Sequence, residues 1–347
     1  MSLIVVLGAG ASKDCASPNI GKNNDYSPPL VTELFSGSNS FRSILDFYPF
    51  AQSAAAEIRL ALKDSKSLEE CIRTEFKESK DIYDKRKFLE LPLYLQDLLW
   101  TVGRNYTTFP DNYDLLIRYC FDLDDVIFIT LNYDLLLDNR LSNYDELDSL
   151  DSYISQSRKW SLVKLHGSVN WARKVKNSLD GLDLGGKVNM LKVFRRFGEN
   201  LEVDEINDII LRQGDVEAMR TDANTALYYP ALSVPVGSDD ELICPKGHLE
   251  FLEKKLSELE SLNLLLIGYS GYDREVLKLL KVSGKKVNSI LAVNGSEESG
   301  RKLIFTISQA LSFIPTENMV YKGTFNDFVQ TGELQSFISE LKQGSTL

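Results

Sequence analysis

The stretch Leu3-Ile4-Val5-Val6-Leu7-Gly8-Ala9-Gly10-Ala11-Ser12 decides the fold. Its five consecutive aliphatic residues are typical of a strand buried on both faces. We expect a tight turn over residues 8–12, whose glycines would let the backbone approach a pyrophosphate closely; a plain turn is the alternative. Lys13 stands where the dehydrogenase fingerprint has its third glycine, and no strand with an acidic residue follows within about 20 to 25 residues, which argues against an ordinary dehydrogenase.

The rest of the chain alternates between apolar runs and segments with helical periodicity. A loop is expected over residues 13–29, followed by helices over 30–121, where apolar residues recur at intervals of three and four. Further helices are predicted over 246–259, from an Asp273 N-cap to 280, and over 325–341. Further strands are expected at 126–130, 162–165, 262–267, 289–293 and 318–321, with an extended segment at 229–236 and a hairpin near 188–197.

This alternation predicts an α/β fold, Rossmann-like, with a mostly parallel sheet and a helical insertion or cap. We expect one domain over residues 1–347. Residues 30–121 would form the helical insertion within it, and the polar residues 173–225 an irregular insertion.

Polar motifs follow four of the predicted buried strands. They begin at Gly8, Asn132, His166 and Gly268. In open α/β sheets, ligands bind at the carboxyl ends of the strands. We therefore expect these motifs to meet at one ligand site.

Each motif has a functional and a structural interpretation. Asn132 could hydrogen-bond a ribose or hold a water, and Asp134 could orient hydroxyl or amide groups, or either residue could cap a helix. His166 could act as a general base near neutral pH or be a structural histidine. The other histidine, His248, is expected to be structural or to lie at the rim of the pocket.

The later motifs are of the same kind. Gly268 and Ser270 could approach a phosphate or ribose or form a simple turn, and Asn294 could meet an adenosine ribose or occupy a turn. Ser12 and Cys15 have no identifiable base or third partner in the sequence, so nucleophilic hydrolysis is disfavoured.

Composition excludes several classes of function. The net charge of −11 disfavours general binding to the phosphate backbones of nucleic acids. Arg195-Arg196 is the only obvious pair of basic residues around which a basic groove could form. None of the four cysteines lies close to another in sequence, so no zinc module and no metal are expected. No apolar run reaches the ~20 residues of a membrane span. The first residues do not have the pattern of a signal peptide, so we expect a cytoplasmic protein.

Taken together and in order, the motifs at residues 8–12, 130–134, 164–168, 268–270 and 292–294 resemble the sirtuin superfamily. They look closest to the sirtuin-like domains of bacterial antiphage-defence proteins, in which Asn-Tyr-Asp and His-Gly-Ser forms are common. The chain departs from protein-deacylating sirtuins. It lacks their two close cysteine pairs, and Leu131 stands where they usually have Gln.

The resemblance implies NAD⁺ as substrate and a role for each matching position. Asn132 and His166 would be catalytic, positioning water and handling a proton at the ribose. The residues implied to bind NAD⁺ are Gly8, Ala9, Gly10, Ser12, Asp134, Gly268, Ser270 and Asn294. The expected reaction is cleavage of the nicotinamide–ribose bond to give nicotinamide and ADP-ribose or a cyclic form.

Two alternatives remain open at this point, a zinc-free NAD-dependent protein deacylase and a non-enzymatic regulator that binds NAD⁺ or ADP-ribose. A hydrolase that consumed cellular NAD⁺ at all times would be toxic. We therefore expect restraint through a homo-oligomer, the helical insertion or a regulatory protein partner.

Overall fold

In the computed structural model of the 347-residue chain, the described residues are 2–15, 26–35, 39–61, 71–72, 74–75, 82–106, 111–155, 157–222, 225–233, 242–271, 273–282, 286–312, 315 and 317–344. Residues 16–25 of the expected loop and 234–236 of the expected extended segment lie outside them. No helix in these ranges combines the length and apolarity needed to cross a membrane.

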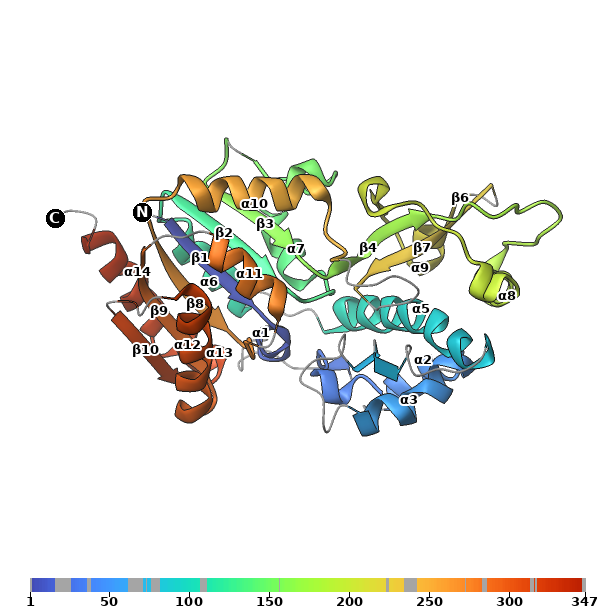
Figure 1. The fold of residues 1–347 in the computed structure, drawn as a ribbon, viewed down its shortest axis with the longest axis horizontal. Helices are drawn as coiled ribbons and strands as arrows, with labels where there is room; N and C mark the ends of the chain where they lie inside the picture. The colour runs from blue at the N-terminus through green and yellow to red at the C-terminus, as the bar shows by residue number, and fades with distance from the viewer. Residues whose placement is uncertain are drawn as a thin grey trace.

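A six-stranded parallel sheet forms the centre of the larger lobe (Figure 1). Its strands lie in the order β10-β9-β8-β1-β2-β3, and every neighbouring pair is parallel. They span Ser2–Leu7 (β1), Asp125–Thr130 (β2), Trp160–Lys164 (β3), Ser261–Ile267 (β8), Lys286–Asn294 (β9) and Glu317–Lys322 (β10). All six strands expected for this sheet are present.

Helices cover both faces of this sheet, which explains the continuous apolar runs in its strands. Leu3 and Val5 pack in the same cluster as side chains of α6 (Asn112–Cys120), α13 (Phe325–Gln330) and α14 (Glu333–Gly344). Ile4 lies on the opposite face. The helices on that face are α10 (Lys246–Glu258), α11 (Arg274–Val282) and α12 (Glu297–Leu311).

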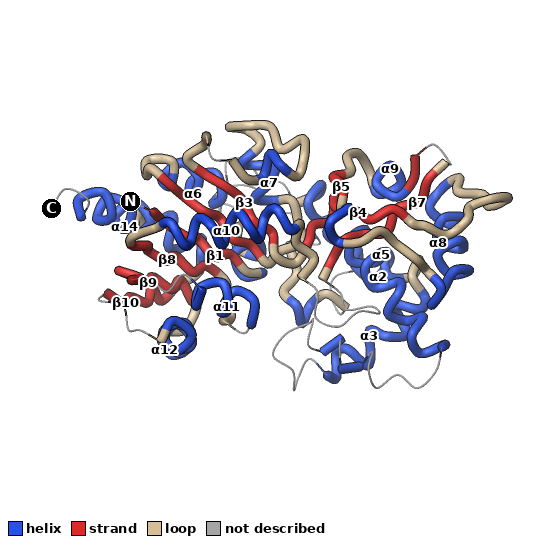
Figure 2. Tube along the Cα trace, turned by 45° about the horizontal axis from the view of Figure 1, so that its top comes forward, coloured by secondary structure: helices blue, strands red, loops and turns tan. Residues whose placement is uncertain are grey.

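A second lobe lies beside the parallel sheet and contains a small antiparallel sheet (Figures 1 and 2). The strand order is β5-β4-β7-β6, with the bounds Ile210–Leu211 (β5), Gly167–Lys174 (β4), Ala226–Leu232 (β7) and Thr221–Asp222 (β6). The long helix α5 (Ile82–Asn105) packs on β4 and β7. The lobe also holds α2 (Asn39–Leu45), α3 (Pro49–Ala61), α8 (Gly186–Phe197) and α9 (Val216–Arg220).

Short elements complete the described chain. They are α1 (Ala9–Lys13), α7 (Leu136–Leu141) and the 3-10 helices η2 (Val31–Glu33), η3 (Asp151–Tyr153), η4 (Gly198–Asn200) and η5 (Ile206–Asp208). The two lobes share one core, because a single cluster of buried residues includes Leu3 of the parallel sheet and Trp171 and Tyr229 of the antiparallel sheet.

The predicted fold class is confirmed, as an α/β protein with a parallel sheet and additional helices. The hairpin expected near residues 188–197 is wrong, because this segment is helix α8. Its buried residues Met190, Leu191 and Phe194 follow helical spacing. The helix expected over 325–341 is broken into α13 and α14 at Gly332, whose φ is +83°. The turn after β1 is the first turn of α1.

Candidate active site

The carboxyl ends of all six parallel strands open into one cavity of about 700 Å³. It is bordered by the segments that follow β1, β2, β3, β8, β9 and β10, as expected for an open α/β sheet. All ten residues predicted for the site line it, namely Gly8, Ala9, Gly10, Ser12, Asn132, Asp134, His166, Gly268, Ser270 and Asn294. The fold therefore brings together the residues that the sequence assigned to one site.

The glycines of the first motif lie against the loop that follows β8. A Cβ at Gly8 would lie 2.5 Å from the carbonyl oxygen of Gly268, and a Cβ at Gly10 would lie 2.8 Å from its Cα. The Gly10 N–H donates to the Gly268 carbonyl at 3.2 Å. Contact between these two loops therefore requires glycine at positions 8 and 10. The sequence alone did not reveal this reason for the two glycines.

We predict that Gly268→Ala destabilises the protein by about 2 to 5 kcal/mol, the combined cost of a left-handed residue and of overpacking. Gly268 has a φ of +59°, and a Cβ there would lie 2.5 Å from the carbonyl carbon of Gly10. Gly332→Ala is the matched control, because its φ is +83° but a Cβ there meets nothing within 4 Å. Urea unfolding should show a loss of only about 1 to 2 kcal/mol in the control. Equal losses in both variants would contradict the close approach of the two loops.

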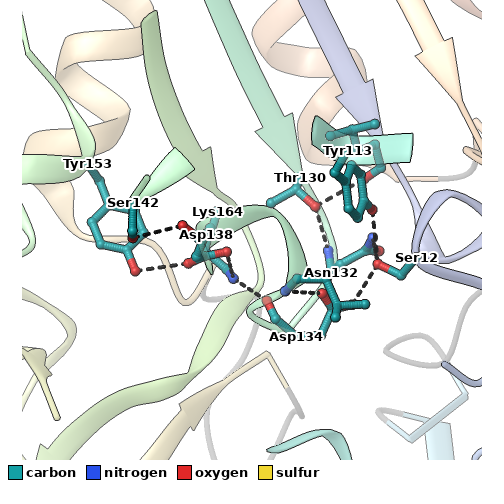
Figure 3. Close-up of polar contacts among 11 residues, drawn as sticks. Ser12, Tyr113, Thr130, Asn132, Asp134, Asp138, Ser142, Tyr153 and Lys164 are labelled. Carbon is teal, nitrogen blue, oxygen red and sulfur yellow. Dashed lines mark hydrogen bonds and ion pairs between the residues drawn. The ribbon is translucent and has the colours of Figure 1, made fainter. Parts of the chain in front are cut away.

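Asn132 is fixed by two hydrogen bonds from its side-chain nitrogen (Figure 3). Nδ2 donates to the carbonyl oxygen of Gly8 at 3.0 Å and to Oγ of Ser12 at 3.0 Å. The backbone N–H of Asn132 donates to Oγ1 of Thr130 at 3.1 Å. The protein thus sets the orientation of the amide, and Oδ1 is the remaining polar atom of this half-buried side chain.

Ser12 links Asn132 to a buried carboxylate (Figure 3). Its hydroxyl donates to Oδ2 of Asp134 at 2.7 Å and lies 3.0 Å from the hydroxyl of Tyr113. Oδ1 of Asp134 accepts the backbone N–H of Leu136 at 3.0 Å. Burial raises the pKa of Asp134 above its usual value, and the nearby Lys164 and Ser12 oppose that shift. Asp134 therefore accepts a backbone N–H at the start of α7 and fixes the position of the Ser12 hydroxyl.

A buried lysine, Lys164, binds the segment that contains Asp134 (Figure 3). Nζ of Lys164, at the end of β3, donates to the carbonyl oxygen of Asp134 at 2.6 Å and pairs with Oδ2 of Asp138 at 2.9 Å. The hydroxyl of Tyr153 donates to Oδ1 of Asp138 at 2.9 Å. Sequence reasoning missed this cluster. The available signal was a lysine at the end of a mostly apolar strand.

His166 is paired with a carboxylate from a distant segment. Its Nε2 lies 2.7 Å from Oδ2 of Asp273, and both side chains are mostly buried, with 8% and 14% of their surface exposed. Oδ1 of Asp273 accepts the backbone N–H of Val276 at 2.9 Å, so the predicted N-cap is confirmed. Asp273 also lines the cavity, and sequence reasoning did not include it in the site.

Of the remaining predicted residues, Ser270 and Asn294 line the cavity, and His248 is not among its lining residues. Ser270 is exposed. Oδ1 of Asn294 accepts the backbone N–H of Ser296 at 3.1 Å, which is the turn contact that the sequence left as an alternative. His248 is buried, and its Nε2 lies 2.8 Å from the carbonyl oxygen of Leu150, in agreement with a structural histidine. Burial lowers the pKa of His248.

None of the four cysteines is among the residues that line the cavity. Cys15, Cys71, Cys120 and Cys244 are all buried and unbridged. Burial raises the pKa of the Cys15 thiol well above its usual value, which makes it a poor nucleophile. Among the described residues, no cluster of three or more His, Cys, Asp or Glu side chains could hold a metal ion.

The chain matches no known protein family by sequence and no curated protein. It is similar to solved structures of Sir2 enzymes. One, from work on the mechanism and regulation of Sir2 enzymes, is 13% identical with a TM-score of 0.40, over 99% of this chain and 93% of that chain. Sir2Tm bound to a propionylated peptide is 15% identical with a TM-score of 0.40, over 97% and 94%. A complex of Sir2 with a p53 peptide and NAD⁺ is 14% identical with a TM-score of 0.39, over 97% and 94%.

Proposed function

We propose that this chain is a sirtuin-like enzyme that binds NAD⁺ and hydrolyses its nicotinamide–ribose bond. The observation that carries the proposal is the single cavity at the carboxyl edge of the sheet, where the glycine loops, a fixed asparagine and a histidine–carboxylate pair meet. Its volume of about 700 Å³ falls within the range of small-molecule sites.

The proposed chemistry needs orientation and charge stabilisation. Nicotinamide leaves with the electron pair of its bond to C1′ of the ribose, so positive charge develops on the sugar as water adds to C1′. The products are nicotinamide, ADP-ribose and one proton. A preorganised polar pocket stabilises such developing charge without reorganising during the reaction. Asn132 suits this role because the protein already holds its amide in one orientation.

Roles are proposed for the other lining residues on the same basis. His166 would accept a proton from the water or from a ribose hydroxyl. Asp134, which holds Ser12, would keep the nicotinamide end of the site in shape. The pyrophosphate would lie along Gly8, Ala9, Gly10 and Ser12, and the adenosine ribose beside Gly268, Ser270 and Asn294.

Incubation of the purified full chain with NAD⁺ tests the proposal. We expect nicotinamide to appear in step with ADP-ribose or a cyclic form, separated by liquid chromatography. Nicotinamide release that depends on an acetyl-lysine peptide would instead indicate a deacylase. Tight binding of NAD⁺ without turnover, at high enzyme concentration and with candidate activators, would indicate a regulator. Absence of both binding and turnover would refute the proposal.

We further propose a role in bacterial antiphage defence, in the cytoplasm, through depletion of NAD⁺. An enzyme with this activity must be restrained in the resting cell. A homo-oligomer, the segment 30–121 or a partner protein would supply the restraint. Activity per molecule that varies with protein concentration, measured alongside oligomeric state, would reveal restraint by assembly.

A further inference from the structure

We infer that Asp273 is a positioning residue for His166, which it holds in the tautomer that carries its proton on Nε2. The Nδ1 lone pair is then the proton-accepting atom of the imidazole. The catalytic consequence of this arrangement rests on the proposed hydrolysis of NAD⁺. The tautomer itself does not, and it can be measured separately.

The contact joins two loops that are far apart in the chain. His166 and Asp273 are separated by 107 positions, and their atoms Nε2 and Oδ2 lie 2.7 Å apart. His166 follows β3 and Asp273 follows β8, and in the sheet these strands are separated by β1 and β2. The pair therefore connects the loops on either side of the glycine turn and Asn132.

Both partners are held in place by further contacts. Oδ1 of Asp273 caps α11 through the backbone N–H of Val276, which leaves Oδ2 directed to the histidine. Helix α11 is anchored by Val276 and Leu280 in the core. The carbonyl oxygen of His166 accepts the backbone N–H of Ser233 at 2.8 Å.

The chemistry of the pair determines the tautomer. An ionised carboxylate only accepts hydrogen bonds, so a neutral imidazole beside it must present an N–H. With 8% and 14% of the two side chains exposed, water competes little for this bond. Because the carboxylate also favours the imidazolium, it stabilises His166 after a proton has been accepted.

Asp273→Asn tests the inference without removing the helix cap, because asparagine is as good an N-cap as aspartate. Its single side-chain oxygen is needed by the N–H of Val276, so its NH₂ group faces His166 and donates to Nε2. The imidazole must then carry its proton on Nδ1. We expect kcat for nicotinamide release to fall by about 10²- to 10⁴-fold. KM for NAD⁺ should stay within about threefold, because ground-state binding is kept.

Asp215→Asn is the matched control. Asp215 caps α9 in the same way, with Oδ1 accepting the backbone N–H of Ala218 at 2.9 Å, and it is not among the residues that line the cavity. This control should keep kcat and KM unchanged. Equal losses in both variants would show that weakened capping, and not the histidine, explains the effect.

Nitrogen-15 NMR of the histidine side chains gives a readout that does not depend on activity. The chain has only two histidines. His248 serves as a reference, because its Nε2 must donate to the carbonyl oxygen of Leu150. At a pH where both rings are neutral, we expect an Nε2–H signal for His166 in the wild type and an Nδ1–H signal in Asp273→Asn, while His248 stays unchanged.

The two measurements separate the possible failures. A wild type that releases no nicotinamide would refute the proposed function. A change of tautomer between the wild type and Asp273→Asn would still support the His166–Asp273 assignment. An Nδ1–H wild type, or a variant whose tautomer does not change, would overturn the assignment itself. An exchanged tautomer with unchanged kcat would overturn the positioning role.

Discussion

His166→Ala is expected to lower the rate of nicotinamide release by about 10²- to 10⁴-fold, the usual contribution of general acid–base catalysis. The imidazole lies in the cavity wall, and its partner Asp273 cannot replace it, since Oδ1 of Asp273 is bound to α11. Chromatographic assay of nicotinamide measures the loss. Circular dichroism and the Tm should show that the variant keeps the fold.

Asn132→Ala is expected to cause a loss of similar size. It removes the amide that is fixed between Gly8 and Ser12, and with it the group proposed to position water. Asn139→Ala, at an exposed position on α7, makes the same chemical change outside the site and should keep full activity. Full activity in both His166→Ala and Asn132→Ala would refute the assignment of the site.

The parallel sheet could be predicted because each strand carries its own signal. A strand buried on both faces must be apolar throughout, and the run from Leu3 to Leu7 meets this requirement without reference to any other part of the chain. Polar residues placed directly after such runs then predict the site, because parallel strands end at one edge. Asn132 and His166 were identified in this way.

What could not be predicted depends on contacts between distant segments. Tyr113 reaches Ser12 from a separation of 101 positions, and Asp273 reaches His166 from 107. Neither pairing leaves a local pattern. The same holds for the antiparallel sheet, whose strand β5 has only two residues, and for the glycines that pack on Gly268. In α8 the polar residues on the exposed face concealed an apolar stripe.

Lys164→Met is expected to lower the free energy of unfolding by about 3 to 5 kcal/mol, the cost of breaking a buried ion pair by removing one partner. The Lys164 side chain is 0% exposed and that of Asp138 is 6% exposed. Water therefore cannot solvate the Asp138 carboxylate once the lysine charge is removed. Only the hydrogen bond from the Tyr153 hydroxyl would still offset the Asp138 carboxylate among the described contacts. Urea unfolding measures the change.

Lys342→Met is the control, since it breaks an ion pair of 2.7 Å whose partners are 43% and 57% exposed. Its cost should not exceed about 1 kcal/mol. Adding Asp138→Asn to Lys164→Met removes the stranded charge and keeps an acceptor for Tyr153, so roughly 2 kcal/mol should return as coupling energy. A single variant no worse than the control would mean that Lys164 does not hold the Asp134 segment. If it does hold that segment, which carries Asn132, loss of activity should accompany the loss of stability.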